Sequence, residues 1–159
     1  MKKASTMFLQ AVTVLIGMVA LAALIGLPLT EGRAANLDVV SVYADPLILY
    51  GYAASIAFFV ALYKAFRLLG YIGQNKVFSS SSVGALKSIK YCALVFSILI
   101  VMAGVFVKLS HHEDDDPAGF IAMCIVTTFA SVVVATAAAI FEKILQKALD
   151  MKSENDLTI

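Results

Sequence analysis

The chain has 159 residues, about one domain's worth, of which 61% are hydrophobic and 14% are charged, with a formal net charge of +1. A typical soluble domain is about 45–50% apolar and about 25% charged. With a mean hydropathy of +0.91, the apolar side chains cannot all be buried in a soluble core of this size. The composition therefore indicates a membrane protein. It excludes a disordered chain, most soluble enzymes and a nucleic-acid-binding domain, so we expect no direct contact with nucleic acid.

Four long apolar segments are the predicted elements in chain order. A bilayer core of about 30 Å requires roughly 20 helical residues, which predicts transmembrane helices over about 7–29, 46–72, 83–109 and 117–152. The first segment is longer than the apolar part of a signal peptide, about 7–15 residues, so we expect it to remain as a helix. The sequence thus predicts an all-α polytopic membrane protein, a four-transmembrane-helix bundle that forms a single domain over residues 1–159.

Local signals mark the starts of three of these helices. Asp45-Pro46 and Asp116-Pro117 precede the second and fourth helices. An aspartate there can accept from free backbone N–H groups, and a proline lacks only an N–H that the first turn does not use. Ser81 or Ser82 is predicted to cap the third helix.

The basic residues predict the orientation in the membrane. Ten of the 12 lysines and arginines lie at the N-terminus, in the segment from Lys64 to Lys90 around the middle loop, or in the C-terminal tail, and the exceptions are Arg33 and Lys108. Cytoplasmic loops carry an excess of such residues. We therefore expect the N- and C-termini and the middle loop to be cytoplasmic, and we expect the basic side to suit anionic membrane lipid.

Small residues recur at helical spacing in all four segments. Apolar burial does not drive helix association within lipid, so close approach through small residues matters there. These residues either close the bundle, which we favour, or form a homo-oligomer. The predicted helix-packing residues are Ala22, Gly26, Gly51, Ser55, Ala93, Ser97, Thr127, Ser131, Ala135 and Ala139.

The end of the fourth helix is amphipathic. Phe141, Ile144, Leu145, Ala148 and Leu149 recur three and four residues apart, which places them on one helical face. This face either packs on the middle loop or the membrane surface, or it binds a partner protein. The candidate residues for a cytoplasmic interaction are Lys76, Lys87, Lys90, Ile144, Leu145 and Leu149.

The sequence contains few of the residue groupings that catalysis requires. The cores of the four apolar segments contain no Asp, Glu, Lys, Arg or His, and such residues mark proton relays and ion paths when present. On helical geometry, Cys92 and Cys124 lie about 14 Å apart in depth, beyond the reach of a disulfide. Both histidines lie in one outer loop. We therefore predict no enzyme activity and no cofactor.

That outer loop concentrates metal-binding types of side chain. Imidazoles and carboxylates suit zinc, nickel or copper, and carboxylates alone suit calcium. The alternative is a solvated hairpin tip, because adjacent histidines on a short loop rarely converge on one ion without further ligands. The candidate ligands are His111, His112, Glu113, Asp114 and Asp116.

Three stretches of the sequence resemble a known family. The runs GQNKVFS at 73–79, LKSIK at 86–90 and ALDMKSENDLTI at 148–159 are similar to the bacterial membrane family called domain of unknown function 2975. The resemblance implies four spans with cytoplasmic ends in a bacterial cytoplasmic (plasma) membrane. The family has no assigned activity, so the resemblance supplies no catalytic residues. Its members are often encoded beside a small helix-turn-helix regulator, which implies such a regulator as a cytoplasmic partner.

The function favoured by these observations is a non-enzymatic accessory or sensory/regulatory membrane protein that acts through its cytoplasmic loop and the C-terminal end of the fourth helix. An oligomeric channel or carrier for a small solute or ion is the alternative. An integral-membrane enzyme of the glutathione-transferase type is a third hypothesis, supported only by Arg67.

Overall fold

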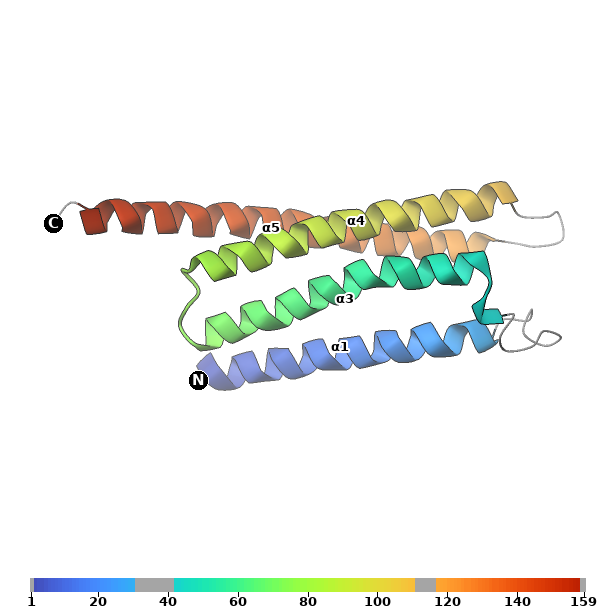
Figure 1. Cartoon of the computed structure of the whole chain (residues 1–159), viewed down its shortest axis with the longest axis horizontal. Helices are drawn as coiled ribbons and strands as arrows, with labels where there is room; N and C mark the ends of the chain where they lie inside the picture. The colour runs from blue at the N-terminus through green and yellow to red at the C-terminus, as the bar shows by residue number, and fades with distance from the viewer. Residues whose placement is uncertain (1, 31–41, 111–116, 158–159) are drawn as a thin grey trace.

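A computed structural model describes residues 2–30, 42–110 and 117–157 of the chain. Its four long helices are α1 (Lys2–Thr30), α3 (Pro46–Gly73), α4 (Ser80–Ser110) and α5 (Ala118–Leu157) (Figure 1). Each is long and apolar enough to cross a membrane, and no strand occurs in the described part. The predicted fold class, an all-α membrane protein with four spanning helices, is confirmed.

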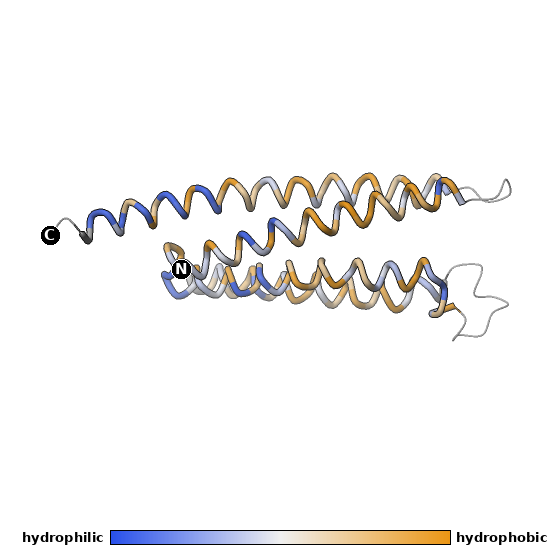
Figure 2. The backbone as a smooth tube through the Cα atoms, turned by 45° about the horizontal axis from the view of Figure 1, so that its top comes forward, coloured by the Kyte–Doolittle hydropathy of each residue, from blue (hydrophilic) through white to orange (hydrophobic). Residues whose placement is uncertain are grey.

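The helices pack in the order in which the chain forms them. α1 packs on α3, α3 on α4 and α4 on α5, and among the described residues no other pair of helices brings its backbones as close. Figures 1 and 2 show the resulting array of antiparallel helices. α1 therefore has one helix neighbour, and its apolar side chains, such as Met7 and Phe8, are largely exposed. In a membrane, lipid would cover this surface.

Small and polar residues form the contact between α1 and α3. A Cβ atom placed on Gly17 would lie 3.0 Å from Cδ2 of Leu62, and one on Gly70 would lie 3.3 Å from Nε2 of Gln10. Gln10 also donates from Nε2 to the carbonyl oxygen of Phe66 at 3.3 Å. The glycines thus allow close approach, and the amide adds an interhelical hydrogen bond, as expected for packing in lipid.

Pro28 interrupts the hydrogen bonding of α1 near its C-terminal end. A proline has no N–H, so the carbonyl four residues earlier, that of Leu24, loses its helical donor. The Tyr52 hydroxyl donates to this oxygen at 3.0 Å, and the Tyr43 hydroxyl donates to the next carbonyl, that of Ile25, at 2.8 Å. The two tyrosine rings stack with centroids 6.5 Å apart. The tyrosines therefore satisfy the proline-disrupted turn and connect it to the start of α3.

Side-chain caps occur at the N-terminal ends of α3 and α4. The predicted aspartate cap is confirmed, because Oδ1 of Asp45 accepts from the Leu47 N–H at 2.8 Å. The prediction that Ser81 or Ser82 caps α4 is wrong. The oxygen Oγ of Ser79 accepts from the Ser82 N–H at 3.3 Å, and α4 begins at Ser80. Sequence alone could not choose among consecutive serines, since the choice depends on the backbone of the preceding turn.

The predicted helix-packing residues differ in burial. Ala93, Ser97 and Ala135, on α4 and α5, are buried, and Ser55, Thr127, Ser131 and Ala139 are half-buried. By contrast, Ala22 and Gly51 are exposed, and a Cβ atom placed on Gly26 or Gly51 would meet nothing within 4 Å. The predicted small residues of α4 and α5 thus lie near a helix contact, whereas between α1 and α3 the close approaches occur at Gly17, Gly70 and Gly73. The physical reason is the rotation of α1 and α3, which turns other glycines toward the neighbouring helix.

Candidate functional site

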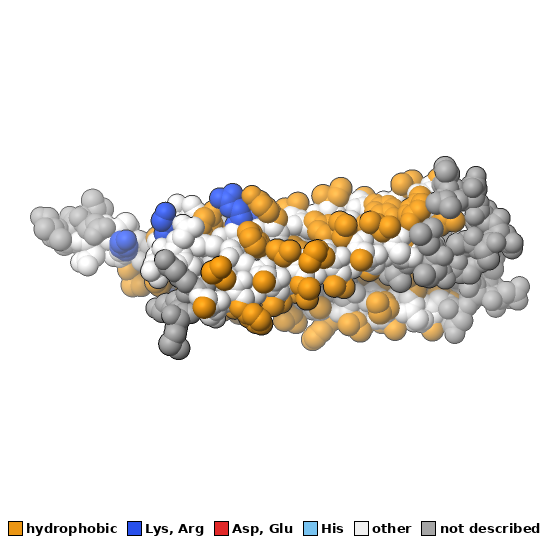
Figure 3. Space-filling view, turned by 90° about the horizontal axis from the view of Figure 1, so that it is seen from below, with side chains coloured by type: hydrophobic (Ala, Val, Ile, Leu, Met, Phe, Trp, Pro, Cys, Tyr) orange, Lys and Arg blue, Asp and Glu red, His pale blue; other side chains and the backbone are white. Residues whose placement is uncertain are grey.

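Most of the predicted interaction residues lie at one end of the fold, which we call the basic end. It comprises the last turns of α3, the connection formed by residues 74–79, the first turns of α4, and the part of α5 that follows from Glu142 onward. On the face shown in Figure 3, the visible Lys and Arg side chains lie toward this end, and apolar side chains are spread along the described surface beyond them. This separation is that of a membrane-spanning body with a water-facing end.

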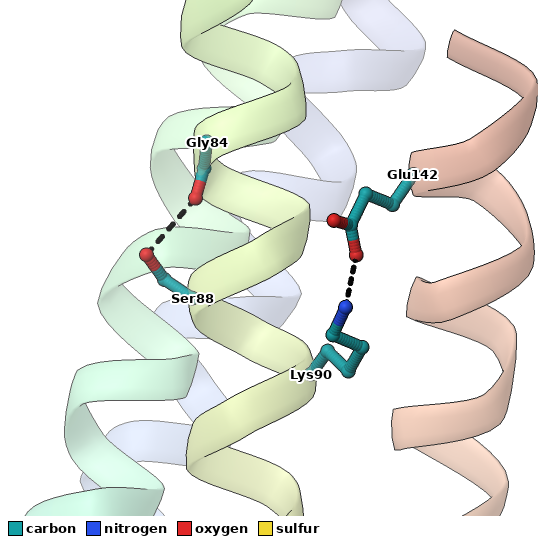
Figure 4. A network of polar contacts seen from close by, with 4 residues as sticks. All are labelled: Gly84, Ser88, Lys90 and Glu142. Carbon is teal, nitrogen blue, oxygen red and sulfur yellow. Dashed lines mark hydrogen bonds and ion pairs between the residues drawn. The ribbon is translucent and has the colours of Figure 1, made fainter. Parts of the chain in front are cut away.

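An ion pair joins α4 to α5 at the basic end. Nζ of Lys90 lies 2.6 Å from Oε2 of Glu142, and the two side chains are only 21% and 18% exposed (Figure 4). Nζ of Lys90 also lies 4.9 Å from the ring centroid of Tyr91. From Lys90 to Ser110, α4 rises about 30 Å at 1.5 Å per residue, which is the thickness of a bilayer core. The pair therefore lies near the boundary between lipid and water, where each charge neutralises the other.

An apolar cluster lies beside the ion pair along the same two helices. Leu86 and Ile89 of α4 pack with Ala138 and Leu145 of α5, and Ala65, Leu68, Val77 and Val83 cover the cluster. Leu145 is 8% exposed. The same chain therefore covers the side chain of Leu145, which leaves it unavailable to a partner.

The amphipathic face predicted for the end of α5 is thus divided between buried and exposed side chains. Leu145 points into the cluster, whereas Phe141 and Ile144 are more than half exposed, at 56% and 55%. Leu149 is half-buried. Of the three lysines predicted for a cytoplasmic interaction, Lys76 and Lys87 are exposed, and Lys90 is bound to Glu142.

Residues 146–157, which we call the α5 arm, continue the helix past the ends of the other helices (Figure 1). The tube is hydrophilic along much of this stretch (Figure 2). Gln146 donates from Nε2 to Oδ1 of Asp150 at 2.9 Å, one turn along the same helix. Met151 is 64% exposed and lies among polar neighbours. The arm therefore presents charged groups and the large apolar side chain of Met151 to water.

Arg67 lies on the exposed surface of α3, between two tyrosines. Its Nη1 donates to the Tyr63 hydroxyl at 3.4 Å, and its Nη2 donates to the Tyr71 hydroxyl at 2.8 Å. Sequence reasoning missed this group, although the spacing of four residues on each side is the signal that could have found it.

The predicted metal ligands His111, His112, Glu113, Asp114 and Asp116 lie outside the described residues. Within the described ranges, no group of three or more His, Cys, Asp or Glu side chains is placed to hold a metal ion. Cys92 and Cys124 are free thiols, as predicted. Cys124 packs closely on α4, since a Cβ atom on Gly104 would lie 3.4 Å from its Cβ.

The fold and its basic end define a multi-pass α-helical membrane protein. Residues 29–159 match the family model described as "Protein of unknown function (DUF2975)", and the chain belongs to this family. The predicted resemblance is therefore confirmed. The chain is similar to "Uncharacterized membrane protein YoaS" of Bacillus subtilis (strain 168), with 46% identity over 161 residues that cover 100% of both proteins. No solved structure matches the chain.

Proposed function

We propose that this chain is a non-enzymatic accessory or regulatory protein of a bacterial plasma membrane. Its basic end and both termini face the cytoplasm, and the α5 arm binds a soluble partner. The observation that carries this proposal is the arm itself, which extends past the other helices and is exposed from Asp150 to Asn155. An exposed helical stretch of this kind is a suitable docking surface for another protein.

The orientation is supported by the distribution of charge. Lys64, Lys76, Lys87, Lys143 and Lys147 all belong to the basic end, and lysines near the ends of spans favour the cytoplasmic side. The relative in Bacillus subtilis supports the bacterial membrane.

The binding surface comprises the α5 arm together with exposed residues nearby. Ile144 and Met151 supply apolar contact area, and they are 55% and 64% exposed. Lys87 and Lys147, which are both exposed, supply charge at the same end of the fold. Leu145 and Lys90 are left out of this surface, because both are used in contacts between α4 and α5.

The partner that the family resemblance implies is a small cytoplasmic helix-turn-helix regulator. Holding such a regulator at the membrane would remove it from the DNA it controls, and no enzyme chemistry is needed for that effect. The membrane protein itself would then make no direct contact with nucleic acid.

Site-specific photo-cross-linking in cells tests the proposal. A photoreactive amino acid is placed at Met151 in the arm, and as a control at Leu109, which is 81% exposed at the opposite end of α4. The expected result is an adduct between Met151 and one soluble regulator, with no such adduct from Leu109. An absence of soluble adducts from Met151, Lys147 and Lys87 alike would contradict the proposal.

An oligomeric channel or carrier is supported less well. A groove between the start of α3 and the end of α4 is lined by Pro46, Leu47, Tyr50, Met102, Ala103 and Phe106. The hydroxyl of Tyr50 donates to the Leu99 carbonyl at 2.8 Å, so the polar group of this groove is already used. Solute flux into proteoliposomes that contain the purified chain would favour the channel instead.

A further inference from the structure

Arg67 lies on the side of α3 that faces away from both neighbouring helices. The side chain of Leu62 and the backbone carbonyl of Phe66 contact α1, and Phe58 contacts Phe96 of α4, with ring centroids 5.8 Å apart. Arg67 lies on a different stripe of α3, which continues through exposed side chains toward the start of the helix. These side chains are Leu49, Ile56, Val60 and Tyr63, which are 55%, 64%, 40% and 55% exposed. In a membrane this apolar stripe faces lipid, and Arg67 stands at its end.

The depth of Arg67 matches the boundary between lipid and water. From Pro46 to Arg67, α3 rises about 32 Å at 1.5 Å per residue, close to the thickness of about 30 Å of a bilayer core. Lys90 lies a similar distance from the other end of α4, about 30 Å. α3 and α4 therefore place Arg67 and Lys90 at similar distances from the opposite end of the fold, close to the level at which phospholipid phosphates lie.

We propose that Arg67, Tyr63 and Tyr71 form a binding site for the phosphate group of an acidic phospholipid at this boundary. The guanidinium group carries five N–H donors in a fixed plane, a geometry that suits the oxygens of a phosphate. Two of its nitrogens each donate to one tyrosine hydroxyl, and the remaining N–H groups stay available.

The tyrosines do more than hold the arginine. Each hydroxyl oxygen accepts from Arg67, so its own hydrogen remains free to donate, and within the described part of the chain neither hydroxyl donates to another residue. The guanidinium carbon lies 6.0 Å and 5.6 Å from the centroids of the Tyr63 and Tyr71 rings, which holds the side chain along the helix surface. Three neighbouring side chains on this side of α3 thus each have a hydrogen-bond donor to offer a ligand.

The net charge of the lipid follows from what surrounds the site. None of the described carboxylates pairs with Arg67, and Lys64 lies one turn away on the same helix. The positive charge is therefore not compensated within the described protein. A headgroup with a net negative charge, such as phosphatidylglycerol, compensates it better than a zwitterionic one.

Native mass spectrometry of the full-length chain in detergent tests the site. Binding of added phosphatidylglycerol is compared with binding of phosphatidylcholine for wild type, Arg67→Gln and the double variant Tyr63→Phe/Tyr71→Phe. Arg67→Gln is expected to weaken phosphatidylglycerol binding about tenfold, since a charge-assisted hydrogen bond is lost. The double variant keeps the rings and the charge but lacks both hydroxyls, and it is expected to weaken binding by about three- to fivefold.

Lys152→Gln is the matched control, because it removes the same charge from the α5 arm and is expected to leave lipid binding unchanged. An equal loss in Lys152→Gln and Arg67→Gln would overturn the proposal, since surface charge alone would then explain the binding. So would unchanged binding in the double tyrosine variant, or equal binding of phosphatidylcholine. Displacement of the lipid by millimolar inorganic phosphate would reassign the site to a free anion and would also overturn it.

Discussion

Nζ of Lys90 lies 2.6 Å from Oε2 of Glu142, and this contact connects the two helices that pack most extensively, α4 and α5. Both side chains are mostly covered, so each charge depends on the other for compensation. The pair stands directly beside the apolar cluster of Leu86, Ile89 and Leu145. Together, the ion pair and the cluster hold the part of α5 that directly precedes the α5 arm against α4.

Breaking the ion pair on one side should be worse than removing it entirely. Lys90→Gln leaves the Glu142 carboxylate mostly covered and without its cation, and Glu142→Gln leaves the ammonium in the same position. We expect each single variant to lower the midpoint of thermal unfolding in detergent, and the double variant to recover part of the loss. If the double variant instead loses as much as the two single variants together, the pair is not coupled.

Gly17 and Gly51 should respond oppositely to a larger side chain. A Cβ atom on Gly17 already lies 3.0 Å from Leu62, whereas one on Gly51 meets open space. Gly17→Val is expected to destabilise the α1–α3 contact by about 1–3 kcal/mol through overpacking. Gly51→Ala should be neutral or stabilising by up to about 1 kcal/mol, because alanine favours the helix. Thermal unfolding of both variants measures these changes in stability. If both variants lost a similar amount of stability, the close α1–α3 contact would not lie at Gly17.

These two glycines also show where sequence reasoning stops. Both occur in long apolar segments, and the packing prediction named Gly51 rather than Gly17. Composition determines that the segments are helices, but the rotation of each helix about its axis depends on its neighbour. The Asp45 cap was predictable, because it needs only the residues beside it. The Lys90–Glu142 pair was not, since it joins residues 52 positions apart, and from the sequence Lys90 indicated the orientation and a cytoplasmic interaction but no ion pair.

The Tyr52 hydroxyl should matter only while Pro28 is present. In wild type it donates to the Leu24 carbonyl, whose helical donor the proline removes. Tyr52→Phe is expected to cost about 0.6–2 kcal/mol, the range for hydrogen bonds between membrane helices. In a Pro28→Ala background the helix can supply its own N–H, so the same change should cost less. A double-mutant cycle on unfolding free energies measures the difference, and strict additivity would contradict the assignment.

Leu145 and Ile144 are neighbours with different expected roles. Leu145 is buried in the cluster between α4 and α5, so Leu145→Ala should destabilise the protein by about 2–3 kcal/mol through a cavity. Ile144 is exposed, so Ile144→Ala should leave stability within about 0.5 kcal/mol and instead weaken cross-linking from the α5 arm. If Ile144→Ala unfolds at a much lower temperature and Leu145→Ala does not, the orientation of this part of α5 is wrong.

The sidedness of the α5 arm decides whether it can meet a cytoplasmic partner. Single cysteines at Met151 and Leu109, each in a chain with Cys92 and Cys124 replaced by alanine, can be labelled in intact bacteria with a membrane-impermeant thiol reagent. We predict labelling at Leu109→Cys in intact cells and at Met151→Cys only after the membrane is opened. Labelling of Met151→Cys in intact cells, with Leu109→Cys protected, would place the basic end outside and contradict the proposed function.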